Sequence, residues 1–131
     1  MGTASPKPTI ALIVEDEFLV RMMAVDLFTD SGFEAIEAAN ADEAILILES
    51  RGDIDVIFTD INMPGSIDGL GLASIVSQRW PSIRVLVTSA LRIPGNRPLP
   101  RGSMFLAKPY QSSQIVGAVR ALAKSPAWSA Q

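Results

Sequence analysis

Short apolar runs rich in β-branched residues alternate with longer amphipathic stretches along this chain, and this alternation constrains the fold more than any other feature. The runs lie at residues 9–14, 33–39, 56–60, 83–88 and 104–107. Strands that alternate with helices form right-handed βαβ units, whose parallel sheet is covered by helices on both faces. The pattern therefore predicts an α/β fold with a doubly wound, five-stranded parallel sheet.

Helical periodicity predicts four helices, at residues 18–31, 41–50, 69–79 and 112–124, the last of which begins at Ser112 or Ser113. Asn40 and Asp68 stand where helix N-caps belong, and Gly32 stands where a C-terminal glycine belongs. These end signals support the boundaries.

Apolar residues at i, i+3, i+4 and i+8 predict the buried face of the first helix: Leu19, Met22, Met23 and Leu27. The two methionines also suit an adaptable binding surface. Packing in the core is the stronger expectation.

Residues 90–103 break the alternation. Pro94, Pro98 and Pro100, with Gly95 and Gly102, crowd the place where a further helix belongs. A proline inside a helix costs about 3 kcal/mol. We expect an irregular connection, or one short helical turn.

Composition excludes several classes of protein. The 131 residues, 48% hydrophobic and 19% charged, suit one domain, at residues 9–124, with flexible tails at 1–8 and 125–131. A net charge of -3 argues against a nucleic-acid partner. The absence of cysteine and histidine removes thiolate nucleophiles, Ser-His catalysis and His-based zinc sites. Without a signal peptide or an apolar run of the roughly 20 residues that span a membrane, we expect a cytoplasmic protein.

Polar residues follow four of the predicted strands. Glu15 and Asp16 follow the first strand and Asp60 ends the third, whereas Thr88 and Lys108 belong to the fourth and fifth. Carboxyl ends of parallel strands meet at one edge, where α/β proteins bind ligands. Each residue alone is a weak signal, since acids after strands are usually solvated and an Asp often starts a turn. Their joint arrival predicts a site.

Three neighbouring carboxylates repel one another, so one stays protonated unless a cation joins them. Oxygen ligands without His or Cys favour Mg²⁺, which commonly bridges one or two carboxylates to a phosphate. Asp60 is then the nucleophile that accepts a phosphoryl group. Lys108 and Thr88 contact the phosphoryl oxygens, and the Asn62 backbone carbonyl completes the metal shell.

Five motifs occur in order along the chain: Val14-Glu15-Asp16-Glu17, Thr59-Asp60-Ile61-Asn62-Met63-Pro64-Gly65, Asp68-Gly69, Val87-Thr88-Ser89-Ala90 and Phe105-Leu106-Ala107-Lys108-Pro109-Tyr110. As a set they are highly specific, and through them residues 9–124 resemble the receiver domain of two-component response regulators. The resemblance implies a flavodoxin-like sheet in the order 2-1-3-4-5. It also implies that a histidine kinase or a histidine phosphotransfer protein phosphorylates the chain.

For the site, the resemblance implies Mg²⁺ bound by Asp16, Asp60 and the Asn62 carbonyl, with Glu15 acting through water. It further implies that Thr88 moves toward the phosphoryl group.

The resemblance also implies that Phe105, as the second switch residue, turns inward. A plain role in the core is an equal alternative for this ring. The Lys108-Pro109 bond is often cis in this family.

The chain departs from the family pattern twice. Glu15 stands where Asp is more usual. The proline-rich segment replaces the family's fourth helix and shortens the interval from Thr88 to Lys108 by roughly two residues, which puts the usual dimer mode in doubt and leaves a homodimer open.

The leading hypothesis is a single-domain response regulator that is not an enzyme beyond its own phosphorylation and dephosphorylation. We expect no effector domain after residue 124, so that the output goes through an unknown protein partner, unless the chain is a piece of a larger protein. A small aspartyl-phosphate phosphohydrolase is disfavoured, because Asn62 stands where the haloacid-dehalogenase family needs a second acid. A pseudo-receiver that only binds partners is the other alternative.

Overall fold

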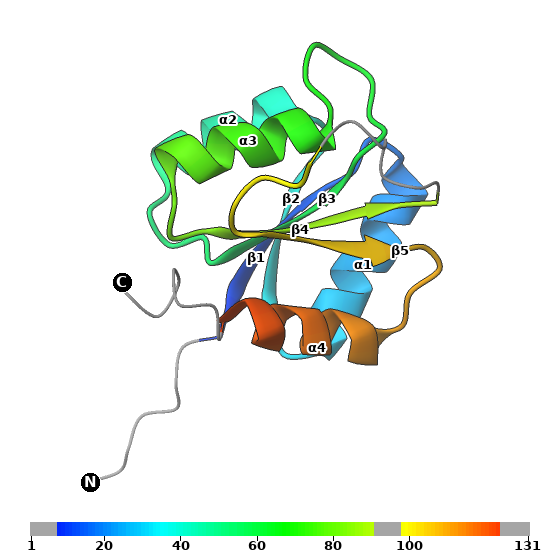
Figure 1. The fold of residues 1–131 in the computed structure, drawn as a ribbon. Coiled ribbons are helices and arrows are strands. Elements are labelled where there is room, and N and C mark those ends of the chain that lie inside the picture. The colour runs from blue at the N-terminus through cyan, green and yellow to red at the C-terminus, as the bar shows by residue number, and fades with distance from the viewer. Residues whose placement is uncertain (1–7, 91–97, 124–131) are drawn as a thin grey trace, which may run out of the picture.

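Five parallel strands form one sheet in the order β2-β1-β3-β4-β5, as predicted (Figure 1). The computed structural model describes residues 8–90 and 98–123. The strands are β1 (Ile10–Val14), β2 (Glu34–Ala38), β3 (Val56–Asp60), β4 (Arg84–Ser89) and β5 (Ser103–Ala107). The register between β3 and β4 places Asp60 beside Thr88, so two predicted site residues are neighbours on adjacent strands.

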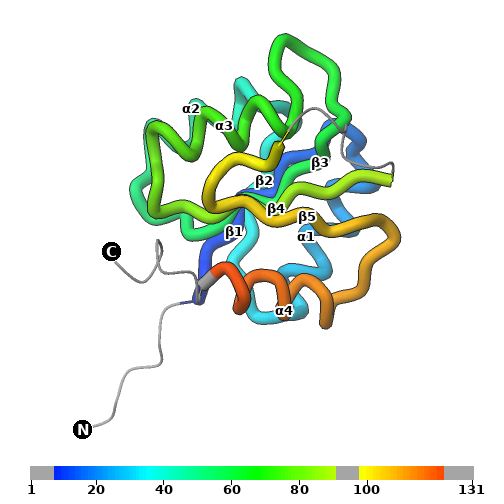
Figure 2. The backbone as a smooth tube through the Cα atoms, in the orientation of Figure 1, coloured from blue at the N-terminus to red at the C-terminus, as the bar shows by residue number. Residues whose placement is uncertain are grey.

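Four helices of the described residues cover the sheet in two layers: α1 (Phe18–Asp30), α2 (Ala41–Ser50), α3 (Gly69–Arg79) and α4 (Ser112–Ala123). The helices α2 and α3 lie on one face, and α1 and α4 lie on the other (Figures 1 and 2). Asn40 and Asp68 cap α2 and α3 as predicted, since their side chains accept hydrogen bonds from backbone N–H groups of the first turns. Gly32, with a φ of 94°, follows the end of α1.

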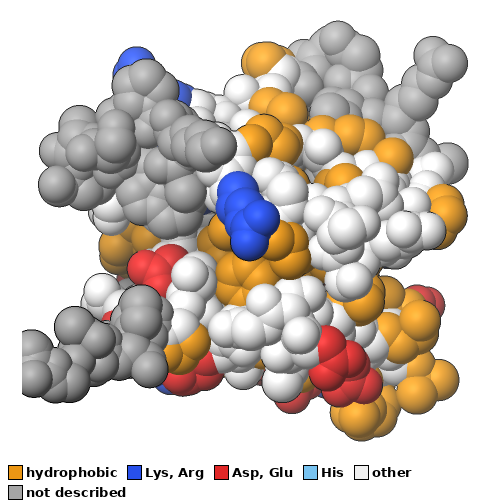
Figure 3. Space-filling model, turned by 90° about the horizontal axis from the view of Figure 1, so that it is seen from below, with side chains coloured by type: hydrophobic (Ala, Val, Ile, Leu, Met, Phe, Trp, Pro, Cys, Tyr) orange, Lys and Arg blue, Asp and Glu red, His pale blue; other side chains and the backbone are white. Residues whose placement is uncertain are grey.

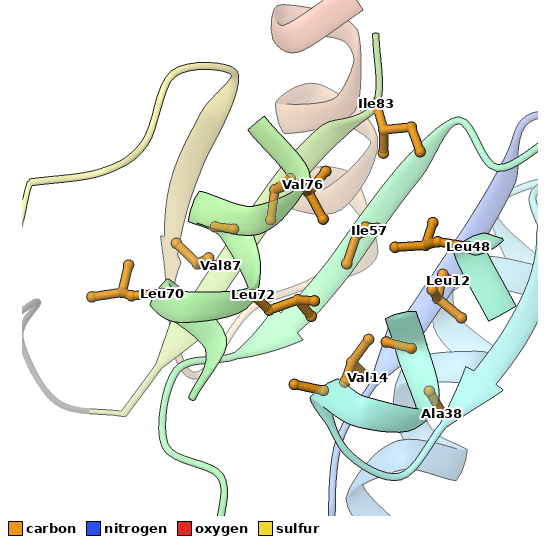
Figure 4. Packing of buried hydrophobic residues seen from close by; sticks show 14 of the residues in the cluster. Leu12, Val14, Ala38, Leu48, Ile57, Leu70, Leu72, Val76, Ile83 and Val87 are labelled. Carbon is orange, nitrogen blue, oxygen red and sulfur yellow. The ribbon is translucent and has the colours of Figure 1, made fainter. Parts of the chain in front are cut away.

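Alternate residues of the strands pack into a hydrophobic cluster on each face of the sheet. Leu12, Ile57 and Val87 face α2 and α3, where they meet Leu48 and Val76 (Figure 4). On the opposite face, the second cluster joins strand residues to α1 and α4: Ile13, Phe58, Leu86, Phe28 and Ile115. Every residue of β3 is buried, which explains why the strand is apolar from Val56 to Phe58 and keeps its polar residues for its carboxyl end.

The predicted buried face of α1 is wrong. The side chains of Leu19, Met22 and Met23 are 73%, 43% and 67% exposed, and Leu27 is only half-buried. The helix instead buries Ala24 and Phe28. Apolar residues occur all round this helix, so periodicity alone could not identify the side that meets the sheet.

The segment between β4 and β5 has no helix over residues 98–102, in line with the irregular connection that was predicted. The rest of that prediction, at residues 91–97, lies outside the described residues, as do residues 1–7 of the predicted first tail and the whole predicted tail at 125–131. Nowhere in the described ranges is a helix long and apolar enough to cross a membrane.

Candidate functional site at the carboxyl edge of the sheet

A cavity of about 360 Å³ opens at the carboxyl edge of the sheet, where the first and third strands end. The loops after β1 and β3 and the ends of β4 and β5 supply its walls, which are lined by Glu15, Asp16, Glu17, Asp60, Asn62, Ala90 and Lys108. All the predicted metal-binding residues and the predicted lysine are therefore brought together. Thr88 does not line this cavity and lies beneath the surface.

Asp60 lies at the floor of the site and is 9% exposed. One carboxylate oxygen, Oδ2, accepts a hydrogen bond of 2.9 Å from the Lys108 ammonium. The other, Oδ1, accepts a hydrogen bond of 3.1 Å from the backbone N–H of Asn62. Both contacts leave this carboxylate in a fixed orientation at the end of a buried strand.

Glu15 is the second buried acid, and Arg21 of α1 donates a hydrogen bond of 2.8 Å to its backbone carbonyl. Burial raises the pKa of the Glu15 carboxyl from 4.5 to about 7. A hydrogen bond from the Glu17 backbone lowers this pKa, whereas the side chain of Asp16 and the charge of Asp60 raise it further. Lys108, whose ammonium lies 3.8 Å from the carboxylate, opposes the rise.

We expect Glu15 to make the metal-free fold less stable as pH rises. Between pH 4.5 and about 7 the folded chain keeps a proton on Glu15 that the unfolded chain releases, so the free energy of unfolding falls through this window. Urea unfolding in a chelator should therefore show a shallower fall for Glu15→Gln than for the wild type. Asp26→Asn, at an exposed carboxyl of α1, is the control and should keep the wild-type slope, and equal slopes in all three proteins would contradict the assignment.

The two predicted switch residues lie behind the cavity. The hydroxyl of Thr88 is buried and has no hydrogen-bond partner among the described residues. Phe105 is partly buried and packs against the cluster under α2 and α3, so both of its predicted roles stay open. The bond between Lys108 and Pro109 is cis, as the resemblance implied.

The donors around the cavity fit Mg²⁺ and a phosphoryl group. They are oxygens without His or Cys, and Mg²⁺ needs only one or two carboxylates because it keeps several waters. The hydroxyl of Thr88, which has no partner in the described part of the chain, is a hydrogen-bond donor next to Asp60 in the sheet register. Within the described ranges, however, no three Asp, Glu, His or Cys side chains already converge as a metal site. Binding of Mg²⁺ by Glu15, Asp16, Asp60 and Asn62 therefore stays a prediction.

Three residues of this region had no role in the sequence-based interpretation. Arg21 anchors the turn after β1, Ser89 accepts a hydrogen bond from the Asn62 side chain, and Tyr110 packs edge-on against Phe58. Burial, with the charges of the two buried acids, raises the pKa of Tyr110 to about 12. Ser89 and Tyr110 carried a signal as members of quoted motifs, whereas Arg21 carried none, because its contact depends on how α1 packs against the turn after β1.

The order of the strands and the polar groups at their carboxyl edge define a flavodoxin-like α/β protein, whose site lies where the strand order reverses, between β1 and β3. The family model for the response regulator receiver domain matches residues 11–120. The chain therefore belongs to the response regulator receiver domain family, as its motifs predicted.

Similar proteins include the transcriptional regulatory protein PdtaR of Mycobacterium tuberculosis, which is 34% identical over 86% of this chain and 55% of its own length. The chemotaxis protein CheY of Thermotoga maritima is 31% identical over 86% of this chain and 96% of its own length. Among solved structures, a CheX-CheY-BeF3-Mg²⁺ complex from Borrelia burgdorferi matches with a TM-score of 0.79 and 28% identity, over 90% of this chain and 91% of that chain. This chain thus spans about half the length of PdtaR but nearly all of that CheY.

Proposed function

We propose that this chain accepts a phosphoryl group on Asp60 from a histidine kinase or a histidine phosphotransfer protein, in a Mg²⁺-dependent step. One observation carries the proposal: the Asp60 carboxylate is held at the base of an acidic cavity by Lys108, 2.9 Å away. Membership of the receiver family, and similarity to a CheY whose structure was solved with BeF3 and Mg²⁺, support it.

The protein's own residues carry out most of this reaction by position and charge. An Asp60 oxygen attacks phosphorus and the donor histidine leaves with the bonding electrons, so the phosphoryl group passes to Asp60. Lys108 exchanges its contact with the free carboxylate for one with a phosphoryl oxygen. Mg²⁺, when bound, would offset the charge of the remaining phosphoryl oxygens.

A protein donor must dock beside this cavity, and α1 offers a surface for it. Leu19, Met22 and Met23 are exposed on α1. Met23 also lines a mostly apolar cavity of about 380 Å³ that shares Ala90 and Lys108 with the acidic one. Exposed apolar patches of this kind mark protein interaction sites. In the view from the α4 side, hydrophobic side chains gather at the centre of the face and at its lower right (Figure 3).

We expect beryllofluoride, a phosphoryl mimic, to bind only when Mg²⁺ is present and to move Thr88 and Phe105. The Thr88 hydroxyl gains an acceptor, and the ring then occupies the space that Thr88 leaves. Backbone and methyl NMR signals of both residues should shift in the wild type, whereas Asp60→Asn should show no change. If the Asp60 signals shift while both switch residues stay still, the chain is an acceptor without this switch.

The same site argues against the two alternative functions, a small aspartyl-phosphate phosphohydrolase and a pseudo-receiver that only binds partners. A phosphohydrolase needs an acid where Asn62 lies, and its amide is occupied by a hydrogen bond to Ser89. A pseudo-receiver has no need for the partly buried ion pair between Lys108 and Asp60. We therefore propose that the chain is not an enzyme beyond its own phosphorylation and dephosphorylation. Its downstream partner, a homodimer and a cytoplasmic location stay predictions.

A further inference from the structure

Ser89 joins three strand ends and bonds to two residues that line the acidic cavity, Asn62 and Lys108. Its hydroxyl accepts a hydrogen bond of 3.0 Å from the side-chain amide of Asn62, which follows β3. Its backbone carbonyl accepts a hydrogen bond of 3.1 Å from the backbone N–H of Lys108, after β5. Ser89 itself ends β4 and is 1% exposed, whereas Asn62 lies at the surface.

Asn62 is consequently held at two points. Its backbone N–H donates to Asp60, and its side chain donates to Ser89, 27 residues further along the chain. Asn62 also lines the acidic cavity. Without the hydroxyl of Ser89, the amide would be free to rotate, and the spaces open to it include the acidic cavity that Asn62 lines.

We infer that Ser89 is a positioning residue that holds the Asn62 amide against the end of β4, so that the open side of Asp60 stays clear. This inference rests on the proposed function. It deepens that function by assigning to Ser89 a part in setting the lifetime of the phosphorylated state. Both the phosphoryl donor and the water that later hydrolyses the acyl phosphate must enter the same cavity. A freed amide would obstruct both.

The test is a double-mutant cycle on Ser89→Ala and Asn62→Ala. Ser89→Ala should slow phosphorylation by acetyl phosphate and lengthen the half-life of phosphorylated Asp60, each by about 2- to 10-fold, which is the range for one neutral hydrogen bond. In the Asn62→Ala background the same substitution should change neither rate, because no amide remains to be held. Ser50→Ala, which removes an exposed hydroxyl bonded within α2, is the matched control and should behave as wild type.

A second measurement reads the position of Asn62 directly. The side-chain amide NMR signals of Asn62 should shift in the unphosphorylated Ser89→Ala protein and not in Ser50→Ala. A rate change of the same size with and without the Asn62 amide, or no rate change at all, would show that Ser89 has only a structural role and would leave the proposed function intact. If the wild type takes up no phosphoryl group, both proposals are wrong.

Discussion

Asp60→Asn should abolish phosphorylation. With acetyl phosphate and Mg²⁺, mass spectrometry of the wild type is expected to show the mass of one added phosphoryl group, and the variant is expected to show none. An amide is a far weaker nucleophile than a carboxylate, and it removes the negative charge that faces Lys108 at 2.9 Å. The substitution changes little in size, so loss of labelling reports chemistry and not packing.

Asp16→Asn and Asp26→Asn are the controls for this experiment. Asp16 lines the cavity as a predicted Mg²⁺ ligand, so its loss should raise the Mg²⁺ concentration needed for labelling while Asp60 remains the modified residue. Asp26 is an exposed carboxyl on α1 and should not affect labelling. If Asp60→Asn is labelled as fully as the wild type, the acceptor is another residue and the proposed function is wrong.

Gly69→Ala should destabilise the fold by about 3 kcal/mol or more, the upper part of the range for overpacking a rigid site. Gly69 begins α3, and a Cβ atom there would overlap the Asp60 carbonyl and come within 2.8 Å of the Ile61 Cα. These are backbone atoms of the chain that carries the acceptor, and they cannot move aside as a flexible side chain can. Differential scanning calorimetry should show a fall in Tm of roughly 10 °C.

Gly117→Ala is the matched control for this prediction. Gly117 lies within α4, and a Cβ atom there would meet no heavy atom within 4 Å. Alanine favours a helix over glycine, so this variant should gain about 0.5 to 1 kcal/mol of stability. Equal effects of the two substitutions would contradict the close packing of α3 on the end of β3.

Local sequence patterns determined most of the strands and helices. β-branched runs fix the strands, and the caps at Asn40 and Asp68 act within one turn of helix, so short stretches of sequence suffice to predict them. The meeting of Glu15, Asp60 and Lys108 at one cavity followed from topology, since parallel strands end at the same edge. The sequence by itself thus determined the sheet and the members of the site, and the resemblance carried by its motifs supplied the order of the strands.

Only the tertiary structure decided which apolar residues of α1 are buried and which contacts fix the site. Ala24 and Phe28 face the sheet while Met22 and Met23 do not, because the choice depends on how the helix seats against a surface formed by distant strands. The hydrogen bond from Asn62 to Ser89 joins residues 27 positions apart. Such contacts depend on loop paths and side-chain rotamers that no local pattern encodes.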